Sequence, residues 1–483
     1  MKTKMFYFII AICAVNYNSY SQTTSIPDSN FEQALIDLGY DTGTPDGSIP
    51  TANINSITSL DVNQKNISDL TGIKDFTLLQ NLDCGNNQIS SLDLSSNTAL
   101  TFLNCYRNNL TSLDISQNTN LRTLDCSEND ITALDTRAST LLRNLFCFKN
   151  DILTLEVGKN IEFLYCENNQ ITSLDVSQNS KLEILRCYNN QISNLNLEGT
   201  TILRTLSGYN NSLTSIDVTQ STGLERLYIQ NNNLTSLDVT KNTLLIDLNF
   251  SNNSISTIDV TQAPNLEDLI LTNNNVSNLD TSQNSSLVKL FFGFNNISTL
   301  DTSNNLNLEQ FICRDNQFTS LDVSHLSVLR ALSCANNNLT ELNIRNGNNS
   351  NMIPAPGISI PLDATGNPNL TCIQVDDDVV NNIHPSWEKD DMAIYSTDCA
   401  TANVTDYQIS SQITISPNPS KDIVFIESPF SIQETKVYSL NGKELNIKVS
   451  QNRSLDISAL TSGVYLLKIK TDKGIGMKKI IKQ

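Results

Sequence analysis

The segment Leu100-Thr-Phe-Leu103-Asn-Cys105-Tyr-Arg-Asn108-Asn-Leu110 is matched 21 residues later by Leu121-Arg-Thr-Leu124-Asp-Cys126-Ser-Glu-Asn129-Asp-Ile131. Both segments carry leucine at positions one and four, cysteine at position six, asparagine at position nine and an aliphatic residue at position eleven. The positions of each unit are numbered from this first leucine. A motif that returns at a fixed period of roughly 20 to 50 residues predicts a stack of similar units rather than one compact core.

The motif occurs along most of the chain, and its starts are 21 residues apart except for one step of 19 residues. It begins at Leu79, Leu100, Leu121, Leu142, Ile161, Leu182, Leu203, Leu224, Leu245, Leu266, Leu287, Leu308 and Leu329. The chain therefore resembles the leucine-rich repeat family over residues 55–345. We expect a mostly β leucine-rich repeat solenoid of about 14 turns.

The second half of each unit repeats the pattern of the first, as in Leu110-Thr-Ser-Leu113-Asp-Ile-Ser-Gln-Asn118. No segment of the repeats has the length or 3.6-residue periodicity of a helix, so each turn should hold two short extended segments. Leucines should point inward and stack on those of the next turn. Asparagine at position nine should satisfy backbone groups where the chain leaves the first segment, which predicts a ladder of side-chain amides.

The 11 cysteines first suggest a disulfide scaffold. Eight of them occupy position six, which elsewhere holds mostly large apolar residues, so this position faces the core and favours buried free thiols. Disulfides between adjacent turns and a zinc site are the alternatives, although single cysteines one turn apart do not match zinc-ligand spacing. The position-six cysteines are Cys84, Cys105, Cys126, Cys147, Cys166, Cys187, Cys313 and Cys334.

Both open ends of a solenoid expose apolar core and need caps. We expect an N-terminal helical cap over residues 22–54, with its helix near 29–38 and Asp28 or Ser29 as N-cap. Residues 346–400 should form the C-terminal cap. A disulfide between Cys372 and Cys399 would close a loop there and contribute on the order of 3 kcal/mol.

The two termini indicate export. Residues 1–21 have lysines, an apolar stretch and a small-residue cleavage site, as in a signal peptide. After a linker at 401–412, residues 413–483 carry 11 Lys/Arg against 6 Asp/Glu, whereas the whole chain has a net charge of −19. The acidity therefore belongs to residues 22–412. Such a surface repels phosphate backbones, so nucleic acid is not an expected partner. We also expect no integral membrane segment after the N-terminus.

Residues 413–483 read as short alternating strands of a small β-sandwich. They resemble the C-terminal sorting domain of type IX secretion cargo, and the matching residues are Pro417, Asn418, Pro419, Gly463, Tyr465, Lys468, Lys478 and Lys479. The resemblance implies the type IX secretion machinery as a partner. It also implies delivery outside a Gram-negative bacterium, with the protein either released or attached to the cell surface.

Positions five and seven of each turn should face solvent on the concave side. Aromatic residues concentrate there in consecutive units, with an arginine among them, and this composition is typical of a binding hot spot. The residues are Phe146, Phe148, Tyr165, Arg186, Tyr188, Tyr209 and Tyr228. The alternative is that the aromatic side chains only brace neighbouring strands.

Aspartates recur in the second half of the units, for example Asp93, Asp114 and Asp135. Capping of each turn by the side chain is the favoured interpretation. Calcium bridging is the alternative, although one carboxylate per turn is few for an ion that takes six to eight oxygen ligands. We assign no cofactor and no metal site.

The leading hypothesis is a secreted or surface-attached recognition protein, internalin-like in general role, that binds an extracellular protein or glycan and has no catalytic activity. The sequence has 2 His and no nucleophile-elbow, zinc-histidine or phosphate-loop motif. An enzyme-associated or carboxylate-based hydrolase module is one alternative, and a structural surface-layer protein is the other. The repeat pattern does not identify the ligand.

Overall fold

The computed structural model describes residues 22–399, 409–440, 442–447, 450, 453–472 and 474–483. The expected signal peptide at 1–21 lies outside these residues, as does most of the expected linker at 401–412. The chain divides into two compact units, unit 1 up to residue 275 and unit 2 from residue 276. The secondary structure is mostly β, as predicted.

Unit 1 begins with a small cap built around a helix. Its elements are β1 (Thr23–Ser25), α1 (Ser29–Asp37), β2 (Ser48–Pro50), α2 (Thr51–Ile54) and η1 (Ile73–Asp75). One carboxylate oxygen of Asp28 accepts hydrogen bonds from the Asn30 and Phe31 N–H groups, which makes Asp28 the N-cap of α1. Its other oxygen accepts from the N–H groups of Ser68 and Asp69. Asp28 therefore ties the helix to the first turn of the repeats.

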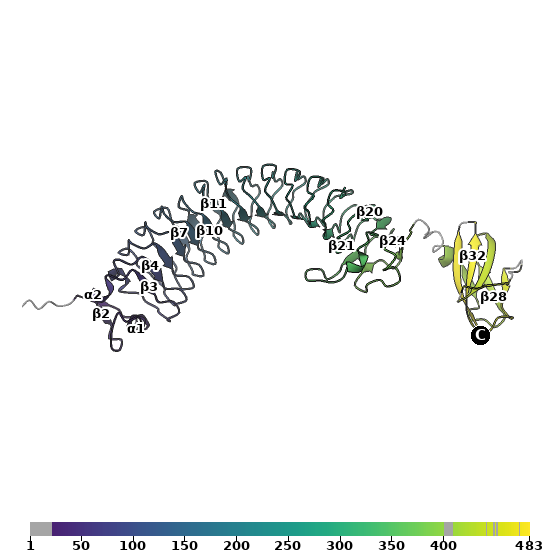
Figure 1. Cartoon of the computed structure of the whole chain (residues 1–483), viewed down its shortest axis with the longest axis horizontal. Helices are drawn as coiled ribbons and strands as arrows, with labels where there is room; N and C mark the ends of the chain where they lie inside the picture. The colour runs from purple at the N-terminus through teal and green to yellow at the C-terminus, as the bar shows by residue number, and fades with distance from the viewer. Residues whose placement is uncertain (1–21, 400–408, 441, 448–449, 451–452, 473) are drawn as a thin grey trace, which may run out of the picture. The chain divides into compact units, whose positions relative to one another are not determined.

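The repeats of unit 1 form one parallel sheet with a strand from each turn. Its strands, in order, are β3 (Ser59–Asp61), β4 (Asn81–Asp83), β5 (Phe102–Asn104), β6 (Thr123–Asp125), β8 (Asn144–Phe146), β10 (Phe163–Tyr165), β12 (Ile184–Arg186), β14 (Thr205–Ser207), β15 (Arg226–Tyr228), β16 (Asp247–Asn249) and β17 (Asp268–Ile270). Pairing is in register, so that Leu103 lies beside Leu124 and Leu124 beside Leu145. These leucines are fully buried. Figure 1 shows the unit as a curved stack of turns, with β10 on its inner side.

The second halves of the turns differ from expectation in one respect. They form strands in only some of the described turns of unit 1, namely β7 (Ala133–Asp135), β9 (Thr154–Glu156), β11 (Ser173–Asp175) and β13 (Asn194–Asn196). β7 pairs with β9 and β11 pairs with β13, both parallel. Continuous ladder bonding is thus confined to the first half of each turn.

The position-six cysteines are fully buried free thiols in both units, which confirms the interpretation as core residues. Burial raises the pKa of each thiol well above its ordinary value, as for Cys105 and Cys166. They therefore remain protonated and act as small apolar side chains.

The position-nine asparagines join successive turns. The Asn129 amide nitrogen donates to the carbonyl of Cys126 in its own turn at 3.1 Å and to that of Cys105 in the preceding turn at 3.0 Å. Its Oδ1 accepts from the Leu110 N–H at 3.0 Å. Each amide thus forms hydrogen bonds with backbone groups of two successive turns, and these groups have no partner in the strand pairing. The predicted asparagine ladder is present.

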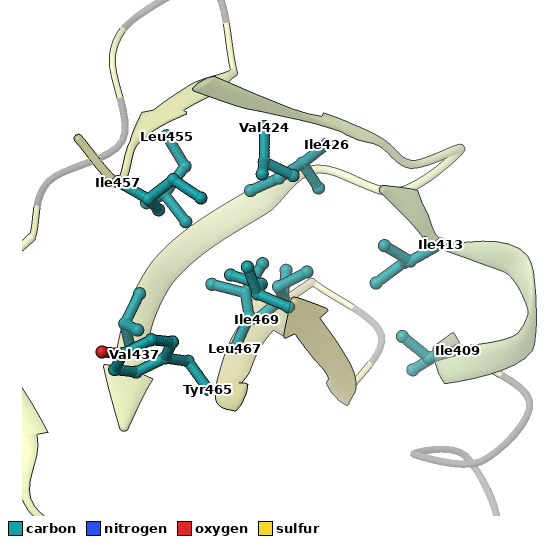
Figure 2. Packing of buried hydrophobic residues seen from close by; sticks show 11 residues of the cluster. Ile409, Ile413, Val424, Ile426, Val437, Leu455, Ile457, Tyr465, Leu467 and Ile469 are labelled. Carbon is teal, nitrogen blue, oxygen red and sulfur yellow. The ribbon is translucent and has the colours of Figure 1, made fainter. Parts of the chain in front are cut away.

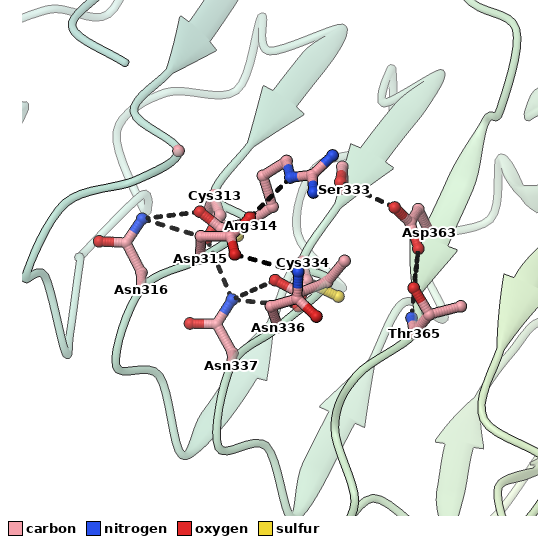
Figure 3. A network of polar contacts seen from close by, with 12 residues as sticks. Cys313, Arg314, Asp315, Asn316, Ser333, Cys334, Asn336, Asn337, Asp363 and Thr365 are labelled. Atoms are coloured by element: carbon pink, nitrogen blue, oxygen red, sulfur yellow. Dashed lines mark hydrogen bonds and ion pairs between the residues drawn. The ribbon is translucent and has the colours of Figure 1, made fainter. Parts of the chain in front are cut away.

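Unit 2 continues the same construction. Its first-half strands are β18 (Lys289–Phe291), β19 (Gln310–Ile312), β21 (Ala331–Ser333), β23 (Leu362–Ala364) and β25 (Glu388–Lys389), and its second-half strands are β20 (Ser320–Asp322), β22 (Glu341–Asn343), β24 (Cys372–Gln374) and β26 (Ile394–Ser396), with η2 at Asn349–Asn351. Figure 3 shows the carbonyl of Cys313 accepting from both Asn316 and Asn337, which is the asparagine ladder again.

Parallel pairing in unit 2 extends past residue 345 into the segment expected to be the cap. Leu332 pairs with Leu362, and Asp363 pairs with Glu388. Asn367 is fully buried and continues the ladder by donating to the Cys334 carbonyl at 3.1 Å. The 21-residue motif does not reveal these turns because longer loops separate their strands.

The disulfide predicted between Cys372 and Cys399 is present. Cys372 begins β24, and Cys399 follows β26, so the bond links the segment after β26 to the second-half sheet. Nearby, the Trp387 indole donates to the Met352 carbonyl at 2.8 Å, which packs a buried aromatic residue into this end of the repeats.

The C-terminal segment is a two-sheet sandwich, as expected. One sheet contains β27 (Thr414–Ser416), β28 (Ile423–Glu427) and β31 (Ser454–Asp456), and the other contains β30 (Glu444–Leu445), β29 (Ile432–Ser439), β32 (Gly463–Thr471) and β33 (Ile475–Lys482). Figure 2 shows their shared core, where Val424 and Ile426 of β28 approach Leu467 and Ile469 of β32.

Substituting Asn129 by alanine should lower the free energy of unfolding by about 2 to 4 kcal/mol, because more than one buried backbone group loses its partner. Urea denaturation followed by circular dichroism measures this change. Asn109→Ala, at an exposed neighbouring position, is the matched control. Equal stability of the two variants would contradict the bridging role of the amide.

Candidate binding face of the repeats

Side chains at positions three, five and seven of each unit 1 turn lie on one side of the sheet, and we call this the strand face. Positions four and six alternate with them and are buried, as Leu164 and Cys166 show. This alternation follows from the two-residue period of a strand. Because every turn is in register, each position forms a row of side chains along the unit.

The position-five row holds the first predicted group. The rings of Phe146 and Tyr165, on β8 and β10, meet edge to face with centroids 5.1 Å apart. The Arg186 guanidinium on β12 lies over the Tyr165 ring, 4.3 Å from its centroid. Arg186 itself is exposed. The result is a cation–π and aromatic cluster with a charged group at the surface.

The position-seven row holds a second group. The rings of Tyr188 and Tyr209 stack almost parallel, with centroids 4.4 Å apart and an interplanar angle of 8°. Glu167, one turn earlier, is only 5% exposed and accepts a long 3.5 Å hydrogen bond from the Tyr188 hydroxyl. Phe148 is the preceding residue of this row and is half-buried. The predicted position-seven residues therefore share a row with a buried carboxylate.

Tyr228 belongs to a separate polar group. Its hydroxyl donates to the Asp247 carboxylate at 3.0 Å, and the Arg226 guanidinium donates to the same oxygen at 2.9 Å. The Arg204 guanidinium binds Glu225 beside them. The structure thus distributes the predicted residues over three local groups. Many of the aromatic contacts are made between neighbouring turns, as the bracing alternative requires.

Burial and nearby carboxylates perturb the ionisable groups of the strand face. Desolvation, followed by the charge of Glu167, raises the pKa of Tyr188 to about 12. Desolvation, followed by the charge of Asp247, raises the pKa of Tyr228 to about 12 as well. Burial also raises the pKa of Glu167. These phenols are therefore neutral hydrogen-bonding groups at neutral pH.

Sequence reasoning missed the position-eight row. Its residues have positive φ angles, which asparagine tolerates better than most side chains, and asparagine recurs there from Asn168 to Asn273. The recurring Asn-Asn pairs at positions eight and nine could have revealed this row. The two asparagines of a pair lie in different environments, because Asn210 is exposed and Asn211 is half-buried. The ion pairs Arg204–Glu225 and Arg226–Asp247 were also missed, because their side chains lie at positions two and three.

The aspartates of the second halves cap their own turns, which was the favoured interpretation. Asp238 Oδ1 accepts from the Thr240 N–H at 2.9 Å and from the Thr240 hydroxyl at 2.7 Å. These hydrogen bonds lower the pKa of the Asp238 carboxyl. Among the residues that the structure describes, no three His, Cys, Asp or Glu side chains are grouped as metal ligands would be.

The predicted sorting residues converge on the last strand of the sandwich. The Asn418 amide donates to the Lys479 carbonyl at 2.7 Å and accepts from the Ile481 N–H at 2.7 Å, so the segment from Pro417 to Pro419 lies along β33. Lys478 is on the same strand. Asn418 thus pairs backbone groups at the edge of this sheet.

Other sorting residues lie on the neighbouring strand β32. Gly463 begins this strand. Tyr465 points into the core and donates to the Thr461 carbonyl at 2.8 Å. Lys468 pairs across to Lys436 and is half-buried. The motif residues thus build both the strand edge and the core of the domain.

The chain is similar to known proteins in two ways. Residues 414–483 match the family model of the secretion system C-terminal sorting domain. Among solved structures, the functional domain of InlJ from Listeria monocytogenes, which includes a cysteine ladder, has 24% sequence identity and a TM-score of 0.58 and covers 96% of this chain and 99% of its own. No curated protein matches the chain.

Two further structures support the fold assignment. The internalin InlF of Listeria monocytogenes has 22% identity and a TM-score of 0.52, covering 68% of this chain and 93% of its own. A leucine-rich repeat protein of Leptospira interrogans has 22% identity and a TM-score of 0.52, covering 70% and 97%. At these identities the likeness shows the fold alone. No helix in the described ranges is both long and apolar enough to cross a membrane.

The predicted leucine-rich repeat fold is therefore confirmed, and the match at 414–483 confirms the type IX sorting domain. The protein is secreted or attached to the cell surface.

Replacing Tyr188 and Tyr228 by phenylalanine should remove two phenols that ionise near pH 12 in an alkaline absorbance titration. Both pKa values are raised in the folded state above the unfolded value of about 10. Their contribution to stability is therefore complete below pH 10 and is lost as pH rises towards 12. If the substitutions instead reduced the absorbance change near pH 10, the partly buried placement of Tyr188 and Tyr228 beside carboxylates would be contradicted.

Proposed function

We propose that this protein is an extracellular recognition protein that binds a protein or glycan through the strand face and does not act as a catalyst. The observation that carries the proposal is the position-five cluster of Phe146, Tyr165 and Arg186. In it the Phe146 and Tyr165 rings contact each other, and the exposed Arg186 guanidinium lies over the Tyr165 ring. Tyrosine and arginine are among the residues most enriched at binding hot spots. Tyrosine in addition loses little conformational freedom on binding.

The stacked pair Tyr188–Tyr209 and the polar Tyr228 extend the same face over neighbouring turns. A broad, rigid repeat surface suits a macromolecule better than a small molecule. The contacts between the rings do not argue against binding, because they hold the side chains in fixed rotamers before a ligand arrives.

The histidines offer little support for the hydrolase alternative. His325 Nε2 lies 3.0 Å from the Thr302 hydroxyl, and His384 Nδ1 lies 2.7 Å from the Ser386 hydroxyl, so each has a local partner on a different part of the chain.

We also propose the domain division expected from the sequence. It comprises an N-terminal cap at 22–54, repeats from 55, a C-terminal cap ending at 400 and the sorting domain.

The combined substitution of Tyr165, Tyr188 and Tyr228 by alanine should weaken binding to any ligand found on glycan and extracellular-protein arrays by about tenfold to a hundredfold. Tyr106→Ala removes a half-buried position-seven ring outside the three groups and is the matched control. Wild-type affinity in the triple variant would overturn the assignment of the strand face, provided that circular dichroism shows a folded protein.

Removing residues 414–483 should leave the protein in the periplasm, because the sorting domain is the part that the secretion machinery recognises. Cell fractionation followed by immunodetection compares this deletion with the complete chain. Surface delivery of the shortened chain at the normal level would show that another segment directs export.

A further inference from the structure

A row of asparagines at position eight of unit 1 forms a second ladder, which we call the amide ladder. In it the Nδ2 of each residue donates to the Oδ1 of the residue one turn earlier, at 2.6 to 2.8 Å. Its members are Asn168, Asn189, Asn210, Asn231, Asn252 and Asn273. All the amides therefore point the same way along the unit.

The amide ladder is not needed to satisfy the backbone of the repeats. That task belongs to the buried position-nine asparagines, such as Asn232, whose amide donates to the carbonyls of Gly208 and Ile229. The position-eight side chains are instead exposed from Asn189 onward. After each bond along the row, an amide still has one N–H and one lone pair available for a ligand.

The neighbouring position-seven row contains polar atoms that lack partners. The stacked rings of Tyr188 and Tyr209 lie between Glu167 on one side and Gln230 on the other. Glu167 Oε2 and Gln230 Oε1 are buried acceptors without a hydrogen-bond donor among the described residues. Glu167 is more than nine-tenths buried, and its row lies directly beside the amide ladder. An acceptor in this setting favours a ligand that brings its own donors.

We propose that the amide ladder and the adjoining Tyr188–Tyr209 pair form a binding track for a linear, uncharged glycan that lies along the axis of the repeats. This inference rests on the proposed recognition function and names its ligand class. Sugar hydroxyls both donate and accept, so one ligand type complements the free N–H groups and lone pairs of the ladder and the unpaired oxygens of Glu167 and Gln230.

The spacing of the ladder favours a glycan over a peptide. Adjacent parallel strands lie about 4.8 Å apart, whereas an extended peptide advances about 3.3 Å per residue and drifts out of step with the amides. An extended chain of pyranose rings advances by nearly one turn spacing per sugar. The acidic composition of residues 22–412 disfavours sulfated or uronic acid polymers, which carry the same sign of charge.

Glycine substitutions of Asn210, Asn231 and Asn252 test the track. Glycine removes the amide and accommodates the positive φ angles of 53°, 56° and 53° at these positions. The matched control combines Lys149→Gly and Asn336→Gly, which are exposed positive-φ positions outside the ladder. Circular dichroism and urea denaturation verify that all variants are folded.

Binding is measured with the purified protein on an array and by calorimetry. The array holds neutral β-linked gluco-, manno- and xylo-oligosaccharides of increasing length, sulfated glycans and extracellular proteins. We expect a neutral series to bind with affinity that rises with chain length over the first several sugars. The triple glycine variant should lose about tenfold or more in affinity, and the control variant should not.

The outcomes separate this inference from the proposed function. Protein ligands without glycan ligands, or glycan binding that survives the triple substitution, would overturn the track while leaving recognition by the strand face standing. Preference for sulfated glycans would also overturn it. Binding to none of the probes would count against both the track and the recognition function.

Discussion

The hydrogen bonds of the buried position-nine asparagines are the constraint on which the repeats depend. A single turn has too few buried groups to be stable alone, so its neighbours must supply the missing contacts. The amide of Asn129 does this for three backbone groups of two turns. Since the turns repeat the arrangement, strand register and turn spacing are fixed together, and leucines and cysteines stack into a continuous core within each unit.

That register turns each surface position into a row. The fold demands only a fitting backbone at positions five, seven and eight, so their side chains are free to vary from turn to turn. Where the same chemistry recurs in adjacent turns, as with Tyr188 and Tyr209 or with Asn210 and Asn231, the side chains contact one another and are held in place. Rigid rows of this kind present a ligand with groups that need little ordering on binding.

Other interactions stabilise the two ends of the repeats and the sheet edge of the sorting domain. Asp28 ties the capping helix to the first turn of the repeats, and the Cys372–Cys399 disulfide ties the segment after β26 to β24. In the sorting domain, Asn418 pairs with the backbone of β33 and covers part of its edge. An uncovered strand edge is an aggregation hazard, which a secreted protein must avoid.

The repeat, the core positions, the favoured burial of the cysteines, the disulfide and the sorting domain could be predicted from the sequence, because each depends on a residue type that recurs at a fixed spacing or belongs to a specific motif. The contacts between surface side chains became known only from the structure. It placed Arg186 over Tyr165, left Glu167 buried beside Tyr188, and joined the position-eight asparagines into a ladder. It also revealed the turns beyond residue 345, whose long loops break the 21-residue period. These features depend on contacts between residues a full turn or more apart, and such contacts arise only when the turns stack in register.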